Sequence, residues 1–195
     1  MNLPSLSFCI PCKNRLYQIQ HTLRKNLDDN VLHDQLIEFV LIDFDSNDGL
    51  RDWIISNFSS ELSSGYLKYY YTKALPQWHA SIAKNTAHLC ASGKILANLD
   101  CDNFTGTWGG AYVLKTFALR GDRCVIHQYS GNTGDNSYGR IAVQTKYFYL
   151  IGGYDESFEP VGYQDGDLID RLLKFGLKYV LNSELLYTIL LMKKN

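Results

Sequence analysis

The sequence predicts an α/β fold, in which a parallel or mixed, Rossmann-like sheet is covered by helices on both faces. Three observations lead to this expectation. Short apolar runs alternate with segments of helical length, which is the pattern of strand-helix-strand units. The chain has 195 residues, enough for one ordinary domain but short for two. Its composition, 46% hydrophobic and 20% charged, is that of a globular protein.

Six apolar runs of strand length are expected to form the sheet: 6–10, 37–42, 67–71, 95–99, 124–127 and 141–143. Six further segments are expected to be helices: 16–26, 50–58, 81–90, 109–119, 145–151 and 165–175. In the third helix, Trp78, Ile82, Thr86 and Leu89 follow helical spacing and are expected to face the sheet, which leaves Lys84 off the buried stripe. The polar stretch 130–137 is expected to be a loop.

Charge and composition exclude some partners. The formal net charge of −1 offers no general attraction to nucleic acid or to an anionic membrane, so no nucleic acid partner is expected.

The first residues lack a basic region followed by an apolar stretch, and the five cysteines are scattered, so we expect a cytoplasmic protein. The apolar stretch 185–192 is too short to span a bilayer. We prefer packing on the core for it over a membrane-surface or partner-docking role.

In open sheets of this class, ligands bind outside the carboxyl ends of the strands, so the residues that follow each expected strand are the first candidates for a site. Segment 11–15 follows the first strand, and segment 43–49 follows the second. Small polar residues there let the backbone approach a flat ring, and the Asp43 carboxylate can accept hydrogen bonds from a base N–H or from ribose hydroxyls. Both loops suit a nucleoside, although for residues 46–49 a turn and helix cap is the preferred interpretation.

The fourth expected strand ends in Asp100-Cys101-Asp102. Two carboxylates one residue apart can share a hard divalent cation and leave its other positions to phosphate oxygens. A solvated pair of loop carboxylates is the alternative. Lys84, on the preceding helix, would add a cation near the same ligand, unless it is a solvated surface residue. The triplet therefore indicates a nucleotide held by a metal ion.

Asp165 and Asp167 precede an apolar pattern of helical spacing. This places both carboxylates in the first turn of the last expected helix, where the helix dipole favours their ionised forms. Ordinary capping would account for one of them. An ionised carboxylate at the edge of a pocket is also what a general base requires.

The order of these motifs resembles that of the family 2 glycosyltransferases, which are inverting enzymes of the GT-A fold. The elements that carry the resemblance cover nearly the whole chain: Ile10-Pro11-Cys12-Lys13-Asn14-Arg15, Asp43-Phe44-Asp45-Ser46-Asn47-Asp48-Gly49, Ala83-Lys84-Asn85 with Ala91-Ser92-Gly93, Asp100-Cys101-Asp102, and Gly152-Gly153-Tyr154-Asp155-Glu156 before Gln164-Asp165-Gly166-Asp167-Leu168. Each motif is weak alone, and their conjunction is specific. The resemblance implies one GT-A domain over residues 1–195, with a nucleotide-binding part at about 1–103 and an acceptor-binding part at about 104–195.

The resemblance also implies roles for individual residues. Asp165 falls where the family places its catalytic base, and Asp102 would bind Mn²⁺ or Mg²⁺ directly, with Asp100 binding through water or the ribose. Asp43 would be the uracil contact of a UDP-sugar donor. The nucleotide-binding set is Pro11, Cys12, Asn14, Arg15, Asp43, Asp45, Lys84, Asp100 and Cys101. A glycan or other hydroxyl acceptor would meet Gln164, Asp167 and Arg140.

Three departures from the family pattern bear on these roles. The family usually has Glu-Asp where this chain has Gln164-Asp165, which removes a carboxylate from the acceptor site. Many members carry a histidine metal ligand well after the base, whereas the last histidine here is His127. The chain also stops about twenty residues after its last expected helix, so the C-terminal elements that often shape the acceptor pocket are small or missing.

The resulting hypothesis is a single displacement, in which Asp165 takes a proton from an acceptor hydroxyl while that oxygen attacks the anomeric carbon of the donor. Two alternatives remain. A nucleotidyltransferase would carry a glycine-rich basic loop after its first strand, and residues 11–15 contain no glycine. A non-catalytic module that binds nucleotide sugars would keep the fold without turnover.

Overall fold

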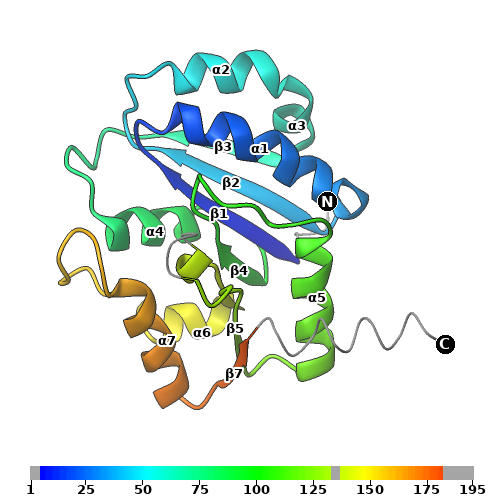
Figure 1. Cartoon of the computed structure of the whole chain (residues 1–195), viewed down its shortest axis with the longest axis vertical. Helices are drawn as coiled ribbons and strands as arrows, with labels where there is room; N and C mark the ends of the chain where they lie inside the picture. Colours follow the sequence, from blue (N-terminus) through cyan, green and yellow to red (C-terminus); the bar gives the residue numbers. More distant parts are fainter. Residues whose placement is uncertain (1–4, 133–136, 182–195) are drawn as a thin grey trace.

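A seven-stranded mixed sheet runs through the molecule (Figure 1). The structure, a computed structural model, describes residues 5–132 and 137–181. The strands are β1 (Leu6–Cys12), β2 (Ile37–Asp43), β3 (Leu67–Tyr71), β4 (Ile95–Asn98), β5 (Cys124–His127), β6 (Ile141–Gln144) and β7 (Lys178–Leu181). Their order in the sheet is β3-β2-β1-β4-β6-β5-β7, and β6 is antiparallel to both of its neighbours. The remaining pairs are parallel, so β1, β2, β3 and β4 present their carboxyl ends at one edge.

Helices cover both faces of the sheet, as the sequence predicts (Figure 1). They are α1 (Leu16–Asn30), α2 (Leu50–Asn57), α3 (Ser59–Ser64), α4 (Ala80–Leu89), α5 (Gly109–Arg120), α6 (Thr145–Leu150) and α7 (Gln164–Lys174), with short 3₁₀ turns at Val31–His33 and Ser137–Gly139. One core lies under α1, α2 and α5, and the other lies under α4, α6 and α7. Leu6, Phe8, Ile10 and Cys12 of β1 pack in the first core and Cys9 packs in the second, because neighbouring side chains of a strand point to opposite faces.

All six expected strands and all six expected helices are confirmed, most within one or two residues of their bounds. The sequence did not predict α3 or β7, and α1 continues four residues beyond its expected end at residue 26. The prediction for the buried face of α4 is confirmed for Trp78 and Ile82, which are partly buried against the second core, but it was wrong for Leu89 and for Lys84. Leu89 is 70% exposed, whereas Ala83, Lys84 and Ala87 are buried against the sheet.

Two predictions concern segments outside the described residues. The apolar stretch 185–192 falls wholly outside them, and the loop expected at 130–137 falls partly outside them. Where the structure does describe the chain, no helix has the length and apolarity needed to cross a membrane.

A buried polar network joins β1, β2 and the turn before β4 at the edge opposite the strand ends. The Ser7 hydroxyl donates to Glu38 Oε1 at 2.6 Å and accepts the Gly93 N–H at 2.8 Å. The Lys68 ammonium lies 2.5 Å from the Glu38 carboxylate. Gly93 approaches β1 so closely that a Cβ there would lie 2.8 Å from the Ser7 backbone nitrogen.

Gly93→Ala is therefore expected to lower the free energy of unfolding by about 1–3 kcal/mol, because the clash is with backbone that cannot move aside. Denaturant unfolding measures this change. Gly166→Ala is the matched control, since a Cβ at that helical position meets its nearest atom, the Tyr138 hydroxyl, at 3.5 Å. Equal stability of the two variants would contradict the close approach of Gly93 to β1.

Candidate active site

A pocket of about 750 Å³ opens where β1 and β4 end. Its lining comprises Pro11, Lys13, Asn14, Arg15, Trp78, Ala80, Lys84, Asp100, Cys101, Asp102, Tyr138, Gly139, Val161, Gln164 and Asp165. These residues come from the end of β1, from the loops after β1 and β4, from the start of α4 and the loop before it, from the segment that precedes β6, and from the start of α7 and the loop before it. The pocket thus lies at the edge of the sheet that the strand-end rule selects.

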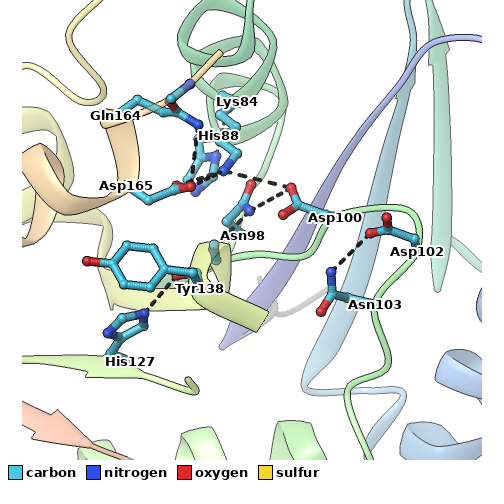
Figure 2. A network of polar contacts seen from close by, with 12 residues as sticks. Lys84, His88, Asn98, Asp100, Asp102, Asn103, His127, Tyr138, Gln164 and Asp165 are labelled. Atoms are coloured by element: carbon cyan, nitrogen blue, oxygen red, sulfur yellow. Dashed lines mark hydrogen bonds and ion pairs between the residues drawn. The ribbon is translucent and has the colours of Figure 1, made fainter. Parts of the chain in front are cut away.

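The two carboxylates of the Asp100-Cys101-Asp102 triplet both line the pocket. The chain turns directly after β4, and the Asn103 N–H donates to the Asp100 carbonyl at 2.9 Å. Asn98, the last residue of β4, donates its amide to Asp100 Oδ1 at 3.1 Å and to the Gly139 carbonyl at 3.0 Å. Asn103 donates to Asp102 Oδ1 at 3.1 Å (Figure 2). Each carboxylate is therefore oriented by a neighbouring asparagine amide.

Lys84 lies between Asp165 and Asp100 (Figure 2). Its ammonium is 2.6 and 2.9 Å from the two Asp165 oxygens and 3.8 Å from Asp100 Oδ1. The Lys84 side chain is only 5% exposed. Burial opposes its charged form, but the nearby carboxylates of Asp100 and Asp165 outweigh burial and raise the pKa of Lys84. A buried, charged ammonium therefore occupies the centre of the acidic site.

Asp165 enters the pocket from the first turn of α7. The residue before the helix, Tyr163, has φ 66°, a left-handed conformation that is strained for a large side chain. Gln164 accepts the Gly162 N–H at 2.8 Å and directs its amide to Asp165 Oδ2 at 3.4 Å. The loop thus turns sharply and places Asp165 facing Lys84.

Five residues of the predicted site lie outside the pocket lining: Cys12, Asp43, Asp45, Arg140 and Asp167. Cys12 and Asp43 are fully buried beneath the lining, and Asp43 accepts the Tyr69 hydroxyl at 2.6 Å and the Ser46 N–H at 2.9 Å. Asp45 is exposed and accepts a hydrogen bond from the Tyr71 hydroxyl.

The two remaining outliers both belong to the predicted acceptor site. Asp167 pairs with Arg171 on the next turn of α7 at 2.6 Å. Arg140 donates to the Phe104 carbonyl at 3.0 Å. Of the three predicted acceptor residues, the structure therefore places only Gln164 in the pocket lining.

Several lining residues were missing from the predicted site. Lys13 donates to the Phe44 carbonyl at 2.6 Å and to the Leu75 carbonyl at 3.3 Å, so its ammonium ties three loops together beside the pocket. Its position directly after a strand could have indicated this. Trp78, Tyr138 and Val161 add apolar surface to the lining, and no local pattern marks them as site residues.

The donor chemistry of Asp100 and Asp102 fits a hard divalent cation, since both offer carboxylate oxygens at the pocket surface. No cluster of three or more His, Cys, Asp or Glu side chains suited to a metal ion occurs within residues 5–132 and 137–181. His127 does not line the pocket: its Nε2 donates to the Tyr138 carbonyl at 2.7 Å, and its Nδ1 accepts the Tyr179 hydroxyl at 2.7 Å. Phosphate and water oxygens could supply further ligands.

His88 supports the helix that carries Lys84. Its Nδ1 donates to the Lys84 carbonyl at 2.7 Å, and its ring stacks on Phe148 with centroids 4.6 Å apart. Burial lowers the pKa of His88 to about 4. An unfolded chain binds this proton at about pH 6.5, so protonation between pH 6.5 and 4 favours the unfolded state.

The free energy of unfolding is therefore expected to fall as the pH drops from 6.5 to 4, by up to about 1.4 kcal/mol per pH unit from this one group. His88→Gln should remove that part of the slope, and replacement of the exposed His21 by Gln should keep it. Denaturant unfolding at pH 7, 6 and 5 measures the slopes. An unchanged slope in His88→Gln would show that this histidine is not held neutral.

No protein-family model matches the sequence, and no curated protein sequence matches it. Solved structures do. The chain is similar to the mannosyltransferase PcManGT from Pyrobaculum calidifontis in complex with GDP-Man and Mn²⁺, with TM-score 0.74, 17% identity and coverage of 93% of this chain and 55% of that one. It is also similar to S. aureus TarS 1-349, with TM-score 0.73, 13% identity and coverage of 91% and 57%.

The same TarS fragment in complex with UDP-GlcNAc gives TM-score 0.72 at 14% identity, with 91% of this chain and 55% of that chain covered. The chain spans a little over half the length of these solved chains. The expected GT-A-like α/β fold is thus confirmed, and at these identities the likeness establishes the fold alone.

Proposed function

We propose that this chain transfers a sugar from a nucleotide sugar to an acceptor hydroxyl with inversion. The observation that carries the proposal is the gathering of Asp100, Asp102 and Asp165 in one pocket at the strand ends of a GT-A-like sheet. These carboxylates come from two segments more than sixty residues apart. The solved structures of similar fold include complexes with GDP-Man and Mn²⁺ and with UDP-GlcNAc, which supports a nucleotide-sugar donor. We propose UDP as its nucleotide, as the sequence resemblance implies.

The nucleotide would lie along the side of the pocket formed by Pro11, Lys13, Asn14 and Arg15. Asn14 and the loop after β2 are joined by two hydrogen bonds, from Asn14 N–H to Ser46 Oγ and from Asn47 N–H to Asn14 Oδ1, both 2.9 Å long. This pairing makes a rigid surface for a flat base or a ribose. Asp43 supports that surface from below through its bond to the Ser46 N–H, and we assign it this indirect role.

Asp102, with Asp100 beside it, would hold Mn²⁺ or Mg²⁺ together with the diphosphate. When bound, such an ion stabilises the negative charge that the leaving nucleoside diphosphate gains. Lys84 adds a fixed positive charge in the same pocket and is buried, so its attraction to phosphate is weakly screened.

Asp165 would accept the proton of the attacking hydroxyl. In the structure its two oxygens face the Lys84 ammonium. A donor diphosphate entering beside Asp100 competes for that ammonium, and release of Asp165 from the pair would leave an oxygen for the acceptor hydroxyl. The Gln164 amide would orient the Asp165 carboxylate. Trp78 and Val161 would line the space for the acceptor.

A non-catalytic nucleotide-sugar-binding module is the second candidate. Two observations favour it: Asp165 is ion-paired with Lys84, and within the described ranges no third His, Cys, Asp or Glu side chain forms a metal-binding group with Asp100 and Asp102. Such a module would bind the donor in the same pocket without consuming it.

Turnover of donor sugars separates the two candidates. The chain is incubated with Mn²⁺ and a panel of UDP- and GDP-sugars, with and without simple glycan acceptors, and the released nucleoside diphosphate is quantified. We expect release from at least one donor, and faster release with a suitable acceptor. Binding of a donor without release from any member of the panel would favour the module.

Gly139→Ala tests whether the nucleotide binds beside Asp100 and Lys84, because Gly139 packs directly against both side chains. An alanine Cβ would lie 2.7 Å from Asp100 Oδ2 and 3.1 Å from the Lys84 ammonium, so one of the charged groups must move. We expect nucleotide affinity to fall by about tenfold, equivalent to about 1.4 kcal/mol, with little change in unfolding temperature because both groups end flexible side chains. Isothermal titration with UDP and Mn²⁺ measures the change. Unchanged affinity would place the ligand away from Asp100 and Lys84.

A further inference from the structure

Helix α1 has two buried stripes of different character. Ile19, Leu23 and Leu27 pack in the apolar core. Beside them, at intervals of four residues, lie Thr22, Asn26 and Asn30, which are 4%, 2% and 0% exposed. Residues four apart share one face of a helix. A buried polar stripe is costly unless its groups find partners, so the partners of these three side chains decide what the stripe does.

The stripe bonds the backbone of the segment between β4 and α5. The Thr22 hydroxyl donates to the Cys101 carbonyl at 2.6 Å. The Asn26 amide donates to the Asn103 carbonyl at 3.0 Å, and its oxygen accepts the Thr105 N–H at 2.8 Å. The two bonded carbonyls belong to the residues on either side of Asp102.

Asn30 completes the stripe by fixing the far end of the same segment. Its amide donates to Thr105 Oγ1 and its oxygen accepts the Gly110 N–H, both at 2.8 Å. The residues between β4 and α5 lie outside any strand or helix, so their backbone groups need partners from elsewhere. Helix α1 supplies several of those partners, and its N-terminal neighbour Arg15 lines the same pocket as Asp102.

We propose that Thr22 and Asn26 are positioning residues for Asp102: they fix the backbone on both sides of it, so that its carboxylate is held ready for a divalent cation. This inference rests on the proposed function, in which Asp102 is the principal metal ligand. Groups that orient a metal ligand typically change metal affinity 10- to 100-fold when they are removed. A purely structural stripe would change only the stability of the fold.

Thr22→Val tests the proposal with little change of shape, because valine replaces the hydroxyl by a methyl group. Thr116→Val is the matched control: Thr116 is also buried, but its hydroxyl donates to the Tyr112 carbonyl within its own helix, at 2.8 Å. Thr22→Ser keeps the hydroxyl and should rescue the loss. Two quantities are measured for each variant: amide hydrogen exchange over residues 99–106, and the Mn²⁺ concentration that gives half-maximal UDP binding.

We expect Thr22→Val to speed exchange over residues 99–106 and to raise the half-saturating Mn²⁺ concentration about tenfold. Thr22→Ser should stay near the wild type in both, and Thr116→Val should change neither. Unchanged exchange in Thr22→Val, or faster exchange with an unchanged Mn²⁺ requirement, would overturn the proposal. If the wild-type chain binds no UDP at any Mn²⁺ concentration, the proposed function fails. Exchange alone then decides whether the stripe holds the segment.

Discussion

Asp165→Asn is expected to lower the rate of sugar transfer by about 10²- to 10⁴-fold, which is the usual contribution of a general base. Asparagine keeps the size of the side chain but cannot accept the proton of the attacking hydroxyl. Because the diphosphate competes with Asp165 for the Lys84 ammonium, loss of the Asp165 charge should not lower the affinity for UDP in the presence of Mn²⁺. Steady-state kinetics on the donor that the panel identifies measures the first effect, and titration with UDP measures the second.

Asp170→Asn provides the control for this prediction. Asp170 is an exposed carboxylate on the same helix, and its loss should leave transfer at the wild-type rate. Full activity of Asp165→Asn would exclude Asp165 as the base. An equal loss in both variants would point to damage of α7 rather than to the chemistry.

Asp102→Asn is expected to remove most of the dependence of nucleotide binding on Mn²⁺. A neutral amide is a far weaker ligand for a hard cation than a carboxylate, so the increase in UDP affinity that Mn²⁺ gives the wild type, about tenfold or more, should largely disappear. Titration of UDP at several Mn²⁺ concentrations measures the effect. Asp52→Asn, at an exposed position of α2, should behave as the wild type. A variant Asp102→Asn that kept the full response to Mn²⁺ would place the metal elsewhere.

Most of the sheet could be predicted from the sequence because its strands are short apolar runs that are buried on both faces, such as β1 and β2. The last strand, β7, lacks that signature. Lys178 and Tyr179 are exposed, and among the strands of the described residues β7 pairs with β5 alone, at the edge of the sheet. Pairing with a neighbour distant in sequence creates this strand, and local periodicity does not reveal such pairing.

The buried face of α4 could not be predicted from hydrophobicity. Ala83 and Ala87 face the sheet because their small side chains allow the helix to approach it closely. Lys84 and His88 share that side, and burial is acceptable for them because Asp100 and Asp165 neutralise the ammonium and the Lys84 carbonyl accepts the imidazole N–H. Those partners are set by the tertiary fold.

The site could be predicted in outline because the carboxyl ends of parallel strands meet at one edge, which brings segments 11–15 and 100–102 together. The sequence does not show which side chains reach the surface. Cys12 belongs to a fully buried strand and packs in the core, and Asp43 is bound by Tyr69 from the adjacent strand. Tyr138 reaches the pocket from a 3₁₀ turn that precedes an antiparallel strand, which the strand-end rule does not cover.

Isothermal titration of the wild-type chain with UDP and with GDP, at zero and at saturating Mn²⁺, tests whether the pocket binds a nucleotide through a metal ion at Asp102. We predict one nucleotide per chain, bound at least about tenfold more tightly with Mn²⁺, and the loss of this enhancement in Asp102→Asn. No binding of either nucleoside diphosphate in the presence of Mn²⁺, or binding that Asp102→Asn leaves unchanged, would contradict it.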